Sequence, residues 1–320
     1  MSIVVTGCAG FIGYHLCLNL LKNNKNVIGI DSINNYYSIK IKNDRLKKLK
    51  AYKKFKFYKI DLIKYNTLNK IFKSNKINIV IHLAAQAGVR YSIKNPYSYT
   101  KNNLVAFSNI IEFCKVYKIK HLLFASSSSV YGNLKKFPLS EKYVCKPIQY
   151  YAATKLSNEI IAESYCKAFD LKITGLRFFT VYGPYGRPDM ALFKFTNSII
   201  KGENVELYNN GNHIRDFTYI DDAINSIVAI MKNKKRTNKF DIVNIASGRQ
   251  IELKKYLGLI ENYLEKKAKI KFLPIQLGDV RKTHANINKL KTKYKYKPKI
   301  KPVIGVKLFI DWYLDYFNYK

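Results

Sequence analysis

The chain has 320 residues, of which 57 are basic and 21 acidic, so its formal net charge is +36. Hydrophobic residues make up 48% of the chain and aromatic residues 14%, which excludes an intrinsically disordered protein. The apolar runs fall short of the roughly 18 residues that a membrane-spanning helix needs, and the first ten residues lack a signal-peptide pattern. The five cysteines are odd in number and lack CxxC spacing, so we expect free thiols, no metal site and a cytoplasmic location.

The positive charge comes mostly from lysine, which accounts for 49 of the 57 basic residues and is spread along the whole chain. Residues 40–59 carry ten basic residues and one aspartate, and residues 289–301 place a lysine at every second position. Such alternation is typical of one face of an extended segment. Since no nucleic-acid-binding motif accompanies either segment, we interpret both as solvated surfaces and expect neither nucleic acid nor membrane as a partner.

Short apolar runs alternate with helical patterns through the first half of the chain. Strands are predicted at residues 2–7, 26–31, 55–61, 77–85, 120–128 and 172–178, and helices at 11–23, 102–117 and 151–169. This alternation is typical of crossover units around a parallel sheet. We therefore predict an α/β protein with a Rossmann-type doubly wound parallel sheet in residues 1–180. Residues 181–320 are predicted to form mostly a smaller substrate-binding region, interleaved with the first.

A glycine-rich segment, residues 6–13, lies between the first predicted strand and the first predicted helix. The spacing of Gly7, Gly10 and Gly13 permits a tight turn, close approach of a pyrophosphate and close helix packing, as in dinucleotide sites. Asp31 ends the second strand, where a carboxylate binds a ribose 2′-hydroxyl and repels a 2′-phosphate, so NAD is favoured over NADP. The alternative is an ordinary turn followed by a surface aspartate.

Other strand ends are expected to line the same crevice. Asp61 ends the third strand and is a candidate acceptor for the adenine amino group, although it could equally cap the segment that follows it. The expected cofactor-binding residues are Gly7, Gly10, Phe11, Ile12, Gly13, Asp31, Asn34, Asp61, Leu62, Leu83, Ala84, Ala85, Asn103, Tyr151 and Lys155.

Tyr151 and Lys155 are four residues apart in a helical pattern, so they lie on one face. A neighbouring cation lowers the pKa of a phenol, which makes Tyr151 a candidate general base for an alcohol or sugar hydroxyl. Tyr150 is a poorer candidate, because the residue four positions later is Thr154. The serine run 126–129 ends the fifth strand and could bind the same substrate oxygen; its alternative role is a polar loop.

Together these segments resemble the nucleotide-sugar epimerases of the extended short-chain dehydrogenase/reductase superfamily, and among them most closely the UDP-glucuronate 4-epimerases. The resemblance lies in residues 6–13 (TGCAGFIG), 29–46, 82–96 (HLAAQAGVRYSIKNP), 125–132 (ASSSSVYG), 151–155 (YAATK), 176–196 (LRFFTVYGPYGRPDMALFKFT), 215–222 and 278–285. Two positions depart from the family pattern: Leu277, where proline is usual, and Asn286, where aspartate is usual.

The resemblance implies an NAD-dependent isomerase that interconverts UDP-glucuronate and UDP-galacturonate through a 4-keto intermediate, in the supply of polysaccharide sugars. It implies Ser127, Tyr151 and Lys155 as catalytic residues. The substrate residues that it implies are Arg90, Ser127, Ser128, Thr180, Arg187, Arg215 and Asp279. Neutral hydroxyls would surround the sugar carboxylate, and the arginine forks suit carboxylate or phosphate.

Three alternatives stay open. A UDP-glucose 4-epimerase and a UDP-glucuronate decarboxylase use the same fold, whereas the dehydratases of the superfamily carry an Asp-Glu pair where this chain has serines. A non-catalytic protein that binds polyanions is the third. We also expect a homodimer, because helices 102–117 and 151–169 carry more apolar residues than one sheet face needs: Leu104, Phe107, Ile110, Ile111, Phe113, Ile160, Ile161, Tyr165 and Phe169.

Overall fold

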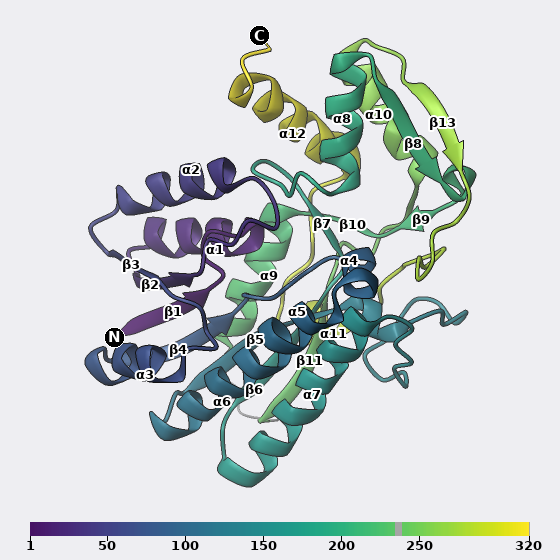
Figure 1. Cartoon of the computed structure of the whole chain (residues 1–320). Coiled ribbons are helices and arrows are strands. Elements are labelled where there is room, and N and C mark those ends of the chain that lie inside the picture. The colour runs from purple at the N-terminus through teal and green to yellow at the C-terminus, as the bar shows by residue number, and fades with distance from the viewer. Residues whose placement is uncertain (234–238, 320) are drawn as a thin grey trace.

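A seven-stranded sheet, in which all paired strands run parallel, forms the centre of the molecule (Figure 1). The computed structural model describes residues 1–233 and 239–319. From edge to edge the strands are β3 (Phe55–Lys59), β2 (Asn26–Asp31), β1 (Ser2–Thr6), β4 (Ile77–His82), β5 (His121–Ser127), β6 (Ile173–Phe178) and β11 (Phe240–Ile245). The predicted Rossmann-type fold class is confirmed, and the strand order reverses between β1 and β4, where such sheets bind ligands.

Helices cover both faces of the sheet, as the alternation of buried residues along the strands requires. In β1, Ile3 and Val5 belong to one buried cluster and Val4 to the other. The first cluster includes residues of α1 (Phe11–Lys22), α2 (Ile39–Lys50) and α9 (Ile220–Lys232), and the second includes residues of α3 (Tyr65–Ser74), α6 (Ala106–Val116) and α7 (Tyr150–Phe169). Each fully buried Val or Ile stabilises the fold by roughly 1.5–3 kcal/mol.

Several predicted elements differ in their bounds from the structure. The strands expected at 55–61 and 77–85 end at Lys59 and His82. The helix expected at 102–117 is α6 preceded by a π-helical turn over residues 100–105 and by α5 (Pro96–Tyr99). The strand expected at 120–128 ends at Ser127, because the chain turns into a short 3₁₀ helix at residues 128–131. This turn places the serine run at the carboxyl edge of the sheet.

The seventh strand, β11, comes from the C-terminal half of the chain and was not predicted. Polar residues interrupt its apolar pattern, and each has a specific partner. Asp241 accepts hydrogen bonds from Lys289 and Lys293 at 2.8 and 2.7 Å, and Asn244 accepts one from the Tyr131 hydroxyl at 2.7 Å. The two halves of the chain therefore share one sheet, while the division at residue 180 stays a prediction.

The same contacts correct the interpretation of residues 289–301 as an extended, solvated face. Their first residues belong to a short helix, α11 (Asn288–Thr292), so Lys289 and Lys293 lie on one side and both reach Asp241. A buried carboxylate such as that of Asp241 needs such partners, and this requirement decides the local structure over the lysine alternation.

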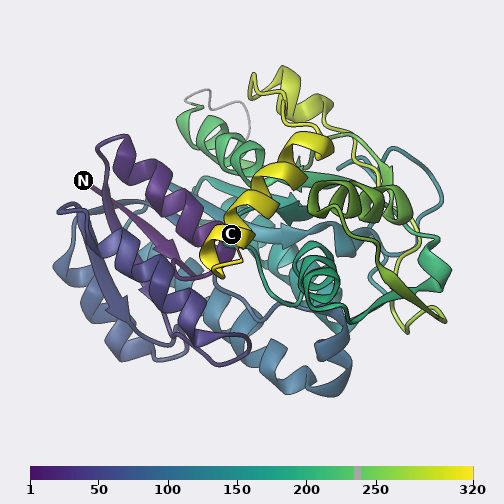
Figure 2. The same cartoon turned by 90° about the horizontal axis from the view of Figure 1, so that it is seen from above.

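The remaining elements lie over the carboxyl ends of the strands, above the sheet in Figure 1, and Figure 2 shows the molecule from that side. They are α4 (Val89–Lys94), β7 (Thr180–Tyr182), α8 (Ala191–Lys201), β8 (Asn204–Tyr208), β9 (Ile214–Arg215), β10 (Phe217–Tyr219), β12 (Ile251–Glu252), α10 (Leu253–Leu264), β13 (Lys269–Leu273) and α12 (Pro302–Tyr316). The last helix returns to the N-terminal half, where the Tyr316 hydroxyl hydrogen-bonds Asp44 of α2.

All five cysteines carry free thiols. Within residues 1–233 and 239–319, the helices are too short or too polar to span a bilayer.

Candidate active site

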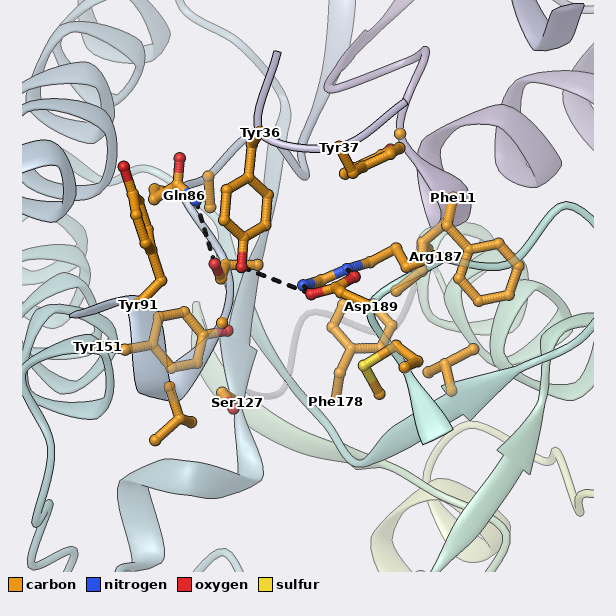
Figure 3. A pocket seen from close by; sticks show the side chains of 18 of the residues that line it. Phe11, Tyr36, Tyr37, Gln86, Tyr91, Ser127, Tyr151, Phe178, Arg187 and Asp189 are labelled. Carbon is orange, nitrogen blue, oxygen red and sulfur yellow. Dashed lines mark hydrogen bonds and ion pairs between the residues drawn. The ribbon is translucent and has the colours of Figure 1, made fainter. Parts of the chain in front are cut away.

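A cavity of about 930 Å³ opens where the strand ends meet the C-terminal elements. Figure 3 shows its interior, with Ser127 and Tyr151 on one side and Phe11 and Arg187 on another. Every predicted site residue lines this cavity apart from Asn103. Residues separated by more than 270 positions, Gly7 and Asp279, therefore share one site.

The glycine-rich loop forms the part of the cavity beside β1. Gly7 has a φ of +70°, and a Cβ at this position would lie 2.8 Å from the Ala84 nitrogen. A Cβ at Gly13 would lie 2.0 Å from the Gly7 carbonyl oxygen, which no side chain permits. The loop thus exposes backbone to the cavity with no room for side chains, as a bound pyrophosphate requires, so these residues fit a dinucleotide.

Asp31 also shapes the glycine loop. Its carboxylate accepts hydrogen bonds from the backbone amides of Ala9 at 3.0 Å and Ile33 at 2.9 Å, and it lines the cavity at the end of β2. Asp31 therefore ties this strand end to the loop, a structural role in addition to the predicted contact with ribose. Asp61 similarly accepts from the Ile63 amide at 3.2 Å, so its carboxylate caps a turn, and it too lines the cavity.

Lys42 belongs to this region although no role was predicted for it. Its ammonium donates to the backbone oxygen of Asn34 at 2.5 Å and to the Asn34 side-chain oxygen at 2.8 Å. Burial lowers the pKa of Lys42 to about 8, against the opposing charge of Asp31. Lys42 thus fixes Asn34 at the cavity wall. Its place in a lysine-rich helix gives no sign of this role, which only the tertiary contacts reveal.

Tyr151 and Lys155 point from α7 toward the end of β5. The Lys155 ammonium donates to the Ala125 backbone oxygen at 2.9 Å, and burial lowers its pKa to about 8. Tyr151 lies in the cavity, where Ser127 is its hydrogen-bonding neighbour. Tyr150 faces elsewhere: its hydroxyl lies 2.5 Å from that of Thr100. The structure thus brings the predicted catalytic residues together and separates Tyr150 from them.

The spacing to Lys155 predicts a lowered pKa for Tyr151, whereas in the structure this pKa is raised. Burial raises the pKa of Tyr151, while the hydrogen bond with Ser127 and the positive charge of Arg187 act in the opposite direction. The ammonium of Lys155 is turned to the Ala125 oxygen, so the helical spacing alone does not acidify the phenol. A further positive charge in the cavity is needed to make Tyr151 a base near neutral pH.

The serines of the 126–129 run divide between two roles. Ser126 donates its hydroxyl to Glu159, which itself accepts from Arg177 at 2.9 and 2.7 Å in a buried ion pair. This network joins β5, β6 and α7 behind the site. Ser127 and Ser128 face the cavity, as does Thr180 at the start of β7.

The predicted substrate arginines occupy different environments. Arg187 forms a two-pronged ion pair with Asp189 at 3.0 and 2.6 Å, and the Tyr36 hydroxyl donates to the same carboxylate at 3.5 Å (Figure 3). Arg215 donates to the backbone oxygens of Ile214 and Arg281, and burial lowers its pKa to about 10.

Arg90 forms an ion pair with Asp279 at 3.2 Å and lies 4.8 Å from the centre of the Tyr208 ring. Arg90 and Arg215 thus place two guanidinium groups at the cavity, together with the carboxylates of Asp279 and Glu206.

Asn103 acts one step away from the cavity. It is buried in the π-helical turn, where it exchanges hydrogen bonds with the backbone of Gln86 at 2.8 and 3.1 Å and donates to Thr154 of α7. Asn103 therefore positions the loop after β4 relative to the Tyr151 helix. Sequence reasoning also missed Gln86 and Tyr36, which line the cavity from loops without regular periodicity, and Tyr91, which lines it from the short helix α4.

Residues 3–246 match the NAD dependent epimerase/dehydratase family. The chain is 44% identical to protein CapI of Staphylococcus aureus over 99% of this chain and 100% of that protein. Among solved structures it is similar to the UDP-glucuronic acid 4-epimerase from Bacillus cereus in complex with UDP-glucuronic acid and NAD, with a TM-score of 0.94 and 35% identity over 99% and 100% of the two chains. It is also similar to the UDP-glucose 4-epimerase from Thermotoga maritima with UDP-glucose, with a TM-score of 0.91 and 28% identity over 99% and 100% of the two chains.

Proposed function

The chain belongs to the NAD dependent epimerase/dehydratase family, and from this premise we propose that it interconverts UDP-glucuronate and UDP-galacturonate by inverting carbon 4 of the sugar. One observation carries the proposal: a single cavity is lined by Ser127, Tyr151 and Lys155, by the glycine-rich loop, and by the guanidinium groups of Arg90 and Arg215. A sugar that lies beside Tyr151 can thus have a dinucleotide on one side and its own diphosphate on the other.

NAD, when bound, supplies a hydride acceptor that becomes the hydride donor of the second half-reaction, so the cofactor is restored in each turnover. The residues that would hold it are those of the glycine-rich loop, Asp31 and Lys155. The close packing at Gly7 and Gly13 supports this assignment, because neither position has room for a Cβ and both line the cavity.

Tyr151 is the residue that we assign to proton transfer. Its phenolate takes the proton of the sugar 4-hydroxyl as carbon 4 becomes a ketone, and the phenol returns a proton when carbon 4 is reduced on its other face. Ser127, the hydrogen-bonding neighbour of Tyr151, holds the same substrate oxygen. Since burial raises the pKa of Tyr151, the phenolate depends on the positive charges of the loaded site and of Arg187.

The substrate carboxylate distinguishes a hexuronate epimerase from related activities. Ser128, Thr180 and Arg187 line the cavity near Ser127 and offer two hydroxyls and a cation to a carboxylate. A 4-keto hexuronate is a β-keto acid, and it loses CO₂ if its carboxylate rotates into line with the ketone. We assign these residues to holding the carboxylate out of that alignment, which would keep the reaction an epimerisation.

A UDP-glucose 4-epimerase is the second candidate, supported by the similarity to the Thermotoga maritima enzyme. The test is to incubate the purified protein with UDP-glucuronate or UDP-glucose without added reductant and to separate the products by chromatography. We expect UDP-galacturonate from UDP-glucuronate, with the higher kcat/KM for this substrate. A higher kcat/KM for UDP-glucose would favour the second candidate, and a UDP-pentose product would show a decarboxylase.

We further propose a homodimer that acts in the cytoplasm and supplies sugar nucleotides for polysaccharide biosynthesis. Support for the dimer comes from α6, α7 and their ends, which leave large apolar side chains exposed: Val105, Val116, Ile160 and Phe169. The free cysteines are consistent with a reducing compartment.

A further inference from the structure

Arg45 is fully buried in α2, a helix whose lysine-rich sequence predicts a solvated surface. Its guanidinium donates to four neutral oxygens: the backbone oxygen of Ala9 at 2.8 Å, the Tyr37 hydroxyl at 2.8 Å, and the backbone oxygens of Tyr185 at 2.6 Å and Gly186 at 3.3 Å. The Arg45 Nε has no acceptor. A buried charge held by dipoles alone is costly, so this arrangement calls for a reason other than stability.

The segments that Arg45 joins all border the active-site cavity. Ala9 belongs to the glycine-rich loop, which is the cofactor end of the cavity. Tyr37 follows Asn34 and Tyr36 on the segment after β2. Tyr185 and Gly186 directly precede Arg187, which lines the cavity and which the proposed function assigns to the sugar carboxylate. One side chain of the nucleotide-binding half therefore contacts three segments that border the cavity, although only Tyr37 among its partners lines it.

Residues other than Arg45 also hold the segment around Tyr185 in place. The His15 ring of α1 donates from Nε2 to the Pro184 backbone oxygen at 2.8 Å, and burial lowers the pKa of His15 to about 4, which keeps the ring neutral. The Tyr185 ring packs 5.2 Å from that of Tyr14 and 4.9 Å from that of Trp312. Tyr185 itself has a φ of +54°, an unfavourable conformation for a side chain of this size that its surroundings must impose.

We infer that Arg45 is a positioning residue that couples the cofactor end of the cavity to the sugar end. The guanidinium is a rigid plane with several donors, so the Ala9 oxygen and the Tyr185 oxygen stay at a fixed separation. An ordered glycine loop then orders the segment that carries Arg187. The inference rests on the proposed function only in calling the second ligand a sugar nucleotide.

Hydrogen–deuterium exchange on the unmutated protein tests the coupling directly. NAD is added alone, and exchange is compared between peptides from residues 183–190 and from residues 203–208, which border the cavity without contacting Arg45. We expect exchange in 183–190 to slow about tenfold, within the usual range of coupling between sites, while 203–208 changes little. Unchanged exchange in 183–190 with NAD bound would overturn the inference, whatever the behaviour of the variants.

Arg45→Lys and Arg45→Met test the side chain itself, with Lys47→Met as the control at an exposed position of the same helix. The single ammonium of a lysine cannot hydrogen-bond the oxygens of both Ala9 and Tyr185. In the folded Arg45 variants, we expect the Kd for NAD and the Kd for UDP at saturating NAD each to rise about tenfold, and the NAD-induced protection of 183–190 to disappear. Lys47→Met should change neither affinity more than about twofold, the ordinary effect of a surface substitution.

Affinities within about twofold of the unmutated protein in Arg45→Lys, with protection of 183–190 retained, would reject the positioning role. A lowered melting temperature with intact coupling would show a structural role only and would equally reject it. These binding tests use NAD and UDP, neither of which is a substrate for epimerisation. The positioning role and the proposed epimerase activity can therefore fail independently of each other.

Discussion

Tyr150 and Tyr151 are neighbours in the chain, yet their hydroxyls face different surroundings. We predict that Tyr151→Phe lowers epimerase turnover by about 10²–10⁴, the usual contribution of a positioned acid–base group, while NAD binding is retained. Tyr150→Phe loses only the contact with Thr100 and serves as the matched control, with turnover within about twofold. Steady-state kinetics and NAD titration measure both. Near-normal turnover of Tyr151→Phe would exclude this residue as the base.

Lys155 illustrates a conflict between function and stability at one residue. Its pKa is about 8 in the folded protein, against 10.5 as the ordinary value. Between these values the unfolded chain binds more protons than the folded protein, so the free energy of unfolding should rise as the pH rises through this window. Below pH 8, the folded protein holds a buried charge.

We therefore predict that Lys155→Met abolishes most activity but makes the NAD-free protein more stable at pH 7. The gain is roughly 1–3 kcal/mol, less than the pKa difference alone implies, because the Ala125 oxygen loses its donor. Urea unfolding at pH 7 and pH 10 measures it, and the pH dependence between 8 and 10 should flatten in the variant. A variant less stable than the unmutated protein at pH 7 would contradict this account. The activity losses of Lys155→Met and Tyr151→Phe should not add, since both act on one proton transfer.

Asp31 carries the prediction of cofactor choice. Its carboxylate repels a 2′-phosphate, so NAD should bind at least about tenfold more tightly than NADP, and Asp31→Asn should narrow the difference while keeping most loop contacts. Lys42, which lies within electrostatic range of Asp31, should favour NADP once that negative charge is removed. Fluorescence titration with both cofactors checks this. Equal affinities for NAD and NADP in the unmutated protein would show that Asp31 does not select the cofactor.

At the scale of elements, a buried ion pair fixes the Tyr151 helix to the sheet. Glu159 of α7 binds Arg177 of β6 and accepts from Ser126 of β5, so one carboxylate connects β6 to the two elements that carry the predicted catalytic residues. Its exposed counterpart on the same helix is the pair between Glu163 and Lys167. Both are pairs of a carboxylate and a cation, but Glu159 binds a guanidinium through two hydrogen bonds and is buried, whereas Glu163 binds one ammonium and is exposed.

We predict that Glu159→Gln lowers the free energy of unfolding by about 3–5 kcal/mol, because it leaves the Arg177 charge buried without a carboxylate. Glu163→Gln should change it by less than about 1 kcal/mol, as solvent already screens that pair. Chemical denaturation of both variants gives the comparison. Similar losses in the two variants would mean that burial does not set the strength of the Glu159 pair.

For the whole molecule, the question of monomer or dimer depends on which apolar residues of α6 and α7 stay exposed. Four of the residues counted for the dimer, Phe107, Ile110, Ile111 and Phe113, are buried against the sheet of their own chain. Ile160 of α7 is 62% exposed and Phe169 is 48% exposed, so these residues are free to contact a second copy.

We predict a homodimer through α6 and α7, with about twice the chain mass of 37.2 kDa in light scattering at micromolar concentration. Ile160→Glu should shift it to the monomer, since it would bury a charge in an apolar interface. The matched substitution Ile270→Glu, at a 43% exposed position of β13, should leave the dimer intact. A monomer in the unmutated protein, or no effect of Ile160→Glu, would rule out this interface.

Features that depend on short-range patterns could be predicted from the amino-acid sequence. The order of β1 to β6, the glycine-rich loop and the shared face of Tyr151 and Lys155 all follow from periodicity and spacing within about ten residues. The family resemblance predicted from those segments is confirmed.

Only the tertiary structure decided the features that depend on partners distant in sequence. The strand β11 holds polar residues that are stable there because Lys289, Lys293 and Tyr131 meet them. Arg45 lies in a helix that its composition marks as solvated, and its four acceptors come from Ala9, Tyr37, Tyr185 and Gly186. The pKa of Tyr151 rises because folding removes water from the phenol, whereas the spacing to Lys155 suggested a fall. Burial and charge at each of these positions are set by residues that folding brings together, and no local pattern in the chain encodes them.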